Sequence, residues 1–145
     1  MSLPVHARDH LTLRLPGHTL PARLPGIRRM LANWASAAGL DVEAVDDVVL
    51  ATNEALANVV DHAYSDGIGD AVLEARPGRS NELVVRVRDS GRWRTPSPDR
   101  GLRGHGMTLI AGLSDFVALH SDDSGTTVEM HWHLPRTSGN GAGAK

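Results

Sequence analysis

Residues 71–89, "AVLEARPGRSNELVVRVRD", decide the fold class. Two apolar-rich stretches, 71–77 and 82–89, are separated by the short polar segment "GRSN", which is typical of a β-hairpin. A second hairpin is predicted further along, where "FVALHSD" (116–122) and "TTVEMHWHL" (126–134) lie on either side of "DDSG". Hairpins pair their strands antiparallel, so we expect a largely antiparallel sheet.

The segments around these hairpins complete a fold prediction. "HLTLRLP" (10–16) alternates polar and apolar residues and predicts a strand. Helices are predicted from about Ile27 to a stop at Gly39, and from a cap at Asp41 to about Tyr64. A shorter helix, "MTLIAGLSD", is predicted to open directly on residues 104–106. The expected fold is α+β: a two-layer α/β sandwich whose mixed, mostly antiparallel sheet is covered on one face by three helices.

The composition indicates one globular domain. The chain has 145 residues, of which 41% are hydrophobic and 22% charged, and we expect residues 10–134 to fold, with 1–9 a flexible N-terminus and 135–145 a disordered Gly-rich tail. A net charge of −2 argues against direct nucleic-acid binding. The absence of cysteine excludes disulfides, thiolate zinc sites and a cysteine nucleophile.

Two further sequence features bear on location and chemistry. No apolar run approaches the roughly 18 residues of a membrane span, and no signal peptide is recognisable, so we expect a cytoplasmic protein without membrane contact. The only lysine is Lys145, which excludes a P-loop and any mechanism with a buried lysine.

The long predicted helix carries a polar stripe made of Glu54, Asn58 and His62, at positions i, i+4 and i+8. The stripe lies away from the predicted core face, which comprises Val45, Val48, Val49, Thr52, Leu56, Val59, Val60 and Ala63. Helical periodicity leaves two interpretations open: a solvated face, or one wall of a ligand cleft. Ala51 and Ala55 beside the stripe favour the cleft, because small residues leave room for a ligand. A carboxylate can serve as a general base, and an asparagine oxygen suits Mg²⁺.

Three features downstream are each ambiguous alone. Asp89, at a strand end, is either a turn former or an acceptor for an exocyclic amine such as that of adenine. "RGHGMT" (103–108) is either a hinge or a phosphate-binding helix start. Thr126 and Thr127 are either β-propensity choices or ligand contacts. Between them, residues 90–106 show no regular period, as functional or disordered loops do.

Together, and in this order, the four features resemble the GHKL ATPases, which have the Bergerat nucleotide-binding fold. Within that superfamily the chain is most similar to the anti-sigma-factor serine/threonine kinases of Gram-positive bacteria. "NEALANVVDHAY" resembles their N box, "RDSG" the first glycine box, "RGHGMTLIAGLSD" the second, and "SGTTVEM" the last strand. The resemblance covers about residues 10–134, with a histidine-kinase-like ATP-binding domain as the implied fold.

The resemblance implies ATP and Mg²⁺ as cofactors and a role for each matching residue. Glu54 would be the general base, and Asn58 would ligate the Mg²⁺ that bridges the ATP phosphates. Asp89 would bind the adenine amino group, with Gly91 beside it and Thr126 contributing through water. The residues that would wrap the phosphates are Gly104, His105 and Gly106, helped by Thr108. Residues 92–103 would form a lid, from which Arg100 or Arg103 could meet a phosphate, and His62 would be a structural histidine.

Two departures from the family pattern leave an alternative open. Trp93 occupies the position of a second glycine in the first glycine box, and His105 separates the glycines of the second. The resemblance implies a kinase that sequesters a sigma factor and phosphorylates a serine of an antagonist protein. It also implies a homodimer, to which the N-terminal strand could contribute an edge. The alternative is a partner-binding module of the same fold that transfers no phosphate.

Overall fold

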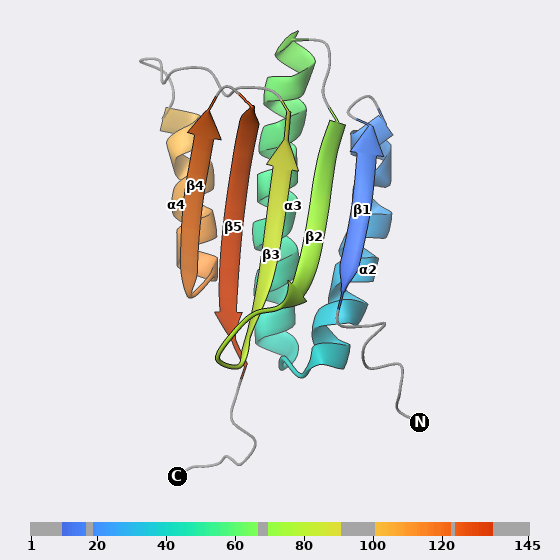
Figure 1. Cartoon of the computed structure of the whole chain (residues 1–145), viewed down its shortest axis with the longest axis vertical. Helices are drawn as coiled ribbons and strands as arrows, with labels where there is room; N and C mark the ends of the chain where they lie inside the picture. The colour runs from blue at the N-terminus through green and yellow to red at the C-terminus, as the bar shows by residue number, and fades with distance from the viewer. Residues whose placement is uncertain (1–9, 17–18, 67–69, 91–100, 123, 135–145) are drawn as a thin grey trace.

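A computed structural model gives the fold of the chain. It describes the backbone of residues 10–16, 19–66, 70–90, 101–122 and 124–134, and their side chains except those of residues 61–66 and 101–106. These parts form five strands and three helices (Figure 1). The strands are β1 (Leu11–Pro16), β2 (Asp70–Pro77), β3 (Glu82–Asp89), β4 (Phe116–Asp122) and β5 (Gly125–His133). The helices are α2 (Leu20–Ala38), α3 (Val42–Asp66) and α4 (Gly101–Leu113).

The strands form one sheet in the order β1-β2-β3-β5-β4, and all four pairings are antiparallel. The two predicted hairpins are β2–β3 and β4–β5, and β5 lies between β3 and β4. The helices lie side by side on one face of the sheet (Figure 1). The two-layer α+β prediction is therefore confirmed. The sheet we expected to be mixed is antiparallel throughout the described strands.

The core lies between the sheet and the helices. Strand residues alternate between the two faces, and on β3 the buried residues Leu83, Val85 and Val87 belong to the core, as do Leu73 on β2 and Met130 on β5. In the described part of the chain no helix covers the opposite face of the sheet (Figure 1), which carries Arg86, Arg88 and Glu129. We refer to it below as the open face.

Helix α2 begins at Leu20, seven residues before the predicted start near Ile27. The prediction was wrong because prolines were taken to end the helical pattern. Pro21 lies in the first turn, where no helical N–H bond is lost, and Pro25 costs one bond. The predicted end is confirmed: Gly39 has φ +115° and its N–H donates to the Ser36 carbonyl at 3.1 Å.

Helix α3 is the middle helix of the layer and packs against both α2 and α4 (Figure 1). Its predicted cap is confirmed, because Asp41 Oδ1 accepts a 2.9 Å hydrogen bond from the Ala44 N–H. The predicted core residues Val48, Thr52, Leu56 and Val59 are buried. None of the three described helices has the length and unbroken apolar composition that crossing a membrane requires.

Candidate functional site

Asp89, Thr126 and the start of α4 lie at one end of the molecule. Strand β3 ends there at Asp89, β5 begins there, α3 ends there and α4 begins there (Figure 1). Asp89 and Thr126 are direct partners in the β3–β5 register. Segments that are far apart in sequence thus meet around this end of the sheet.

Asn58 lies on the part of α3 that is covered by the neighbouring elements. Its side chain is 6% exposed, and its buried Nδ2 has no hydrogen-bond partner within the described part of the chain. Glu54 is one turn earlier, about 6 Å along the helix axis, and is partly buried. The Glu54–Asn58 part of the stripe is therefore not a fully solvated helix face.

Ala51 and Ala55, beside the stripe, are both fully buried. We expected these small residues to leave room for a ligand, but they are part of the hydrophobic core. The correction follows from the position of α3: a helix with a neighbour on each side buries a wider arc than its apolar period alone predicts. Any ligand would therefore approach the Glu54–Asn58 flank rather than pass between the alanines.

The Asn58 amide, which has no hydrogen-bond partner among the described residues, shows whether this site suits Mg²⁺ and the phosphates of a nucleotide. A buried donor without a partner costs about 1–3 kcal/mol, and such groups are rare in native proteins unless function uses them. An amide has both an oxygen, which suits Mg²⁺, and an N–H group, which suits phosphate or water. The described residues include no group of three His, Cys, Asp or Glu that could hold a metal. A site with a single protein ligand plus substrate phosphates fits this chain and the usual coordination of Mg²⁺.

The β3–β5 end is polar and tightly packed. Asp89 is 5% and Thr126 1% exposed. The residue before Thr126, Gly125, has φ +144°, and a Cβ there would lie 2.1 Å from the Asp89 carbonyl oxygen. Glycine at this position therefore allows β5 to begin directly beside the last residue of β3.

One site residue was missed at the sequence level. The hydroxyls of Ser121 and Thr126 are hydrogen-bonded at 2.9 Å, across the β4–β5 hairpin. The hairpin register would have predicted this pair. Asp122 and Gly125 are partners next to the turn, and Ser121 and Thr126 are the next pair along β4 and β5. Ser121 orients the Thr126 hydroxyl and becomes part of the candidate site.

Helix α4 differs from its prediction. It begins at Gly101, so the expectation that it opens on Gly104, His105 and Gly106 is corrected. In an α-helix only the first-turn N–H groups lack a helical partner, so His105 and Gly106 lie beyond the free donors. Their phosphate-binding role stays a prediction, and it would require the first part of α4 to unwind. Thr108 lies on an exposed part of α4.

Several predicted residues lie outside the part of the chain that is described. These are Gly91, Trp93, Arg100 and the rest of the 92–100 lid segment, the ends 1–9 and 135–145, and the side chains of His62, Arg103 and His105.

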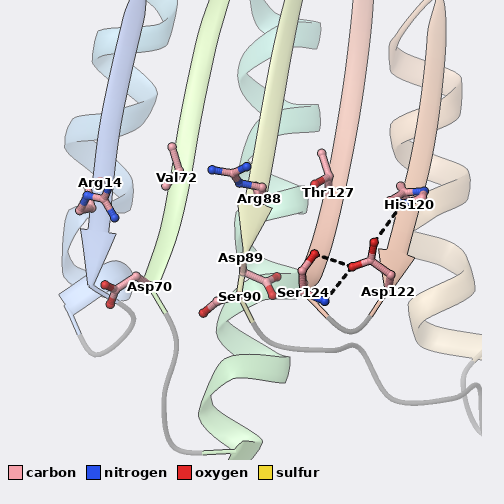
Figure 2. Close-up of a pocket in the computed structure, with 11 residues that line it drawn as sticks. Arg14, Asp70, Val72, Arg88, Asp89, Ser90, His120, Asp122, Ser124 and Thr127 are labelled. Atoms are coloured by element: carbon pink, nitrogen blue, oxygen red, sulfur yellow. Dashed lines mark hydrogen bonds and ion pairs between the residues drawn. The ribbon is translucent and has the colours of Figure 1, made fainter.

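A cavity of about 370 Å³ lies near the same end of the sheet (Figure 2). Its lining shares Asp89 with the predicted site but includes neither Glu54 nor Asn58 nor Thr126 among the described residues. Most of the lining comes from the open face, and the cavity adjoins the candidate nucleotide site at Asp89.

Comparisons with known proteins identify relatives that share most of the length of this chain. A Listeria monocytogenes protein named serine-protein kinase RsbW is 34% identical over 137 residues, covering 84% of this chain and 85% of its own. The Bacillus velezensis protein of the same name is 30% identical over 142 residues, covering 87% and 86%. A Clostridium acetobutylicum protein named anti-sigma F factor is 29% identical over 119 residues, covering 71% and 80%.

A solved structure of the RsbU and RsbW domains of a Mycobacterium tuberculosis protein superposes with a TM-score of 0.68. At 24% identity it covers 86% of this chain and supports the fold alone. This chain spans about a third (32%) of that longer chain.

The family profile described as "Histidine kinase-like ATPase domain" matches residues 18–132, which include every element from α2 to nearly the end of β5. A match over so much of the chain establishes the family. The chain is a member of the histidine kinase-like ATPase domain family.

Proposed function

We propose that this protein is an ATP- and Mg²⁺-dependent protein serine/threonine kinase that acts as an anti-sigma factor. It would bind a sigma factor and phosphorylate a serine on an antagonist protein. The names of its relatives, serine-protein kinase RsbW and anti-sigma F factor, support this assignment. A homodimer and a cytoplasmic location are part of the same proposal.

The observation that carries the proposal is the buried amide of Asn58, which has no hydrogen-bond partner within the described residues and lies one helical turn from Glu54. Most buried amides in proteins are hydrogen-bonded, so an amide without a partner supports a ligand-binding role. In this proposal Asn58 holds Mg²⁺, which when bound neutralises charge on the phosphates. Glu54 accepts the proton of the attacking serine hydroxyl, and this chemistry needs positioning more than covalent help.

The strand end supplies the base-binding part of the proposal. Asp89 accepts a hydrogen bond from the adenine amino group, and Thr126, oriented by Ser121, contacts the base through water. Both residues are almost fully buried, so these hydrogen bonds would form with little competition from solvent. Gly91, Arg103, Gly104, His105, Gly106 and Thr108 keep their proposed roles at the base and the phosphates.

Phosphate transfer from labelled ATP to a candidate antagonist protein tests the kinase directly. Glu54→Ala should lower transfer by at least about 100-fold, the usual contribution of a general base. Glu43→Ala is the matched control, because Glu43 is an exposed carboxylate in the first turn of the same helix. Unchanged transfer in Glu54→Ala would remove Glu54 from the mechanism.

The second candidate is a partner-binding module without phosphotransfer. The helical conformation of residues 104–106 favours it, since the glycine run offers no free N–H groups beyond the first turn. Calorimetric titration with ATP, with and without Mg²⁺, separates the two functions. Saturable Mg²⁺-dependent binding supports the kinase, whereas absence of nucleotide binding supports the module. Light scattering tests the homodimer independently.

A further inference from the structure

The cavity on the open face is built on one row of cross-strand neighbours. Arg14 on β1 pairs with Val72 on β2, Val72 with Arg88 on β3, Arg88 with Thr127 on β5, and Thr127 with His120 on β4. All five line the cavity of about 370 Å³ (Figure 2). Adjacent strands are about 4.8 Å apart, so the backbones of the two arginines are separated by about 10 Å. Both side chains are long enough to reach a group that lies above Val72.

The two arginines are both exposed on the open face. Neither guanidinium has an ion pair or hydrogen bond within the part of the chain that is described. Figure 2 shows the Arg88 guanidinium directed toward β2, on the side of Arg14. Two exposed cations on one face repel each other weakly in water, and a shared anion would remove that repulsion.

The neighbouring row of cross-strand residues, which contains Arg86, differs from the cavity row in having carboxylate partners for its arginine. There Arg86 binds Glu129 at 2.7 Å and lies 3.6 Å from Glu74. The residue at the position of Glu74 in the cavity row is Val72, two residues earlier on the same strand. The sheet thus supplies carboxylates to Arg86 and an apolar floor to the cavity arginines.

The acidic residues of the lining lie at the end of the sheet rather than in the row. Asp122 is engaged: it accepts hydrogen bonds from the N–H and hydroxyl of Ser124 at 2.8 and 2.6 Å, and lies 3.3 Å from His120. Asp70 is beside Pro16 in the β1–β2 register, and the buried Asp89 is the last residue of β3. These three carboxylates limit the total negative charge that the cavity accepts, which favours a ligand with one compact anionic group.

We propose that this cavity is a binding site for an oxyanion, a carboxylate or phosphate group held between Arg14 and Arg88 above Val72. Guanidinium groups bind such ions through paired N–H donors, and Thr127 adds a hydroxyl beside Arg88. The site does not depend on the proposed kinase activity. It adjoins the candidate nucleotide site, because Asp89, which follows Arg88 on β3, belongs both to the cavity lining and to that site.

The test is a titration of the whole chain followed by amide NMR signals of Val72 and Thr127. The probes are inorganic phosphate and, separately, a blocked peptide with one glutamate, at low and constant ionic strength. An exposed two-arginine site should bind with a dissociation constant on the order of 1 mM, and added salt should weaken it. A response to phosphate identifies a free anion as the source, and a response to the peptide alone identifies an acidic side chain of a protein. Either supports the proposal.

The variant Arg88→Gln should weaken binding at least about tenfold while leaving Mg²⁺–ATP binding intact. Arg79→Gln is the matched control, since it removes the same charge from an exposed turn at the far end of the sheet. Circular dichroism confirms that both variants fold. Absence of saturable shifts with both probes, or equal weakening by both variants, would overturn the proposal.

Discussion

Replacing Asn58 by leucine tests the hypothesis that its buried amide serves Mg²⁺ and ATP binding. Leucine has nearly the shape of asparagine but no donor, so the substitution removes the unpaired Nδ2. We expect the free energy of unfolding without nucleotide to rise by about 1–2 kcal/mol, the desolvation cost of a buried unpaired donor reduced by minor repacking. For 145 residues the entropy of unfolding is about 0.3 kcal/mol/K, so Tm should rise by roughly 3–7 °C.

The same variant should lose Mg²⁺-dependent ATP binding, measured by calorimetry alongside urea unfolding. If the variant is more stable but no longer binds ATP, Asn58 is needed for function and lowers the stability of the wild-type protein. Asn53→Ala is the control, because Asn53 Oδ1 accepts an exposed 3.1 Å hydrogen bond from Arg28. This variant should be less stable but should bind ATP as the wild type does. Destabilisation of Asn58→Leu by more than about 1 kcal/mol, with ATP binding preserved, would refute the reasoning.

Three further predictions concern the framework of the site. Gly125→Ala should lower the unfolding free energy by about 2–4 kcal/mol, because a Cβ there meets a backbone carbonyl at positive φ. The control Gly112→Ala, which has open space around it, should raise the unfolding free energy by about 0.5–1 kcal/mol. Equal shifts in Tm for the two variants would contradict this prediction. Thr52→Val, which removes a buried unpaired hydroxyl, should raise the urea midpoint by the equivalent of about 1 kcal/mol. Burial opposes the charge on His131, but hydrogen bonds to Glu129 and a second carboxylate outweigh it and raise the pKa of His131 above 6.5. Its stabilisation is therefore complete below pH 6.5 and lost as pH rises through the higher folded pKa, so His131→Gln should flatten the fall of unfolding free energy above pH 6.5.

Local chemistry predicted most of the fold. The hairpins, the stop at Gly39 and the cap at Asp41 each depend on residues close together in sequence, and all are present. The start of α2 was missed because proline rules apply to helix interiors, and Pro21 lies in a first turn. The start of α4 was missed because glycines were interpreted as a loop, whereas they continue the helix.

The candidate site was predicted less completely, because its main properties are tertiary. Periodicity placed Asn58 opposite the core, but it counts residues on one helix and ignores which helices flank it. The burial of Asn58 follows from α2 and α4 on either side of α3. The approach of Arg14 and Arg88 likewise requires the order β1-β2-β3, which hairpin patterns leave undetermined for the first strand.

The end of β3 joins the two faces of the sheet in one short segment. Arg88 lines the oxyanion cavity, and the buried Asp89 belongs both to that lining and to the candidate nucleotide site. Gly125 packs against the carbonyl of Asp89, so the backbone there cannot shift without moving β5 and Thr126 as well. An anion that pulls on Arg88 would therefore act on the residues proposed to hold adenine, through a chain of direct backbone contacts. Such coupling is reciprocal: ATP should change the phosphate affinity of the cavity by the same factor by which phosphate changes ATP affinity.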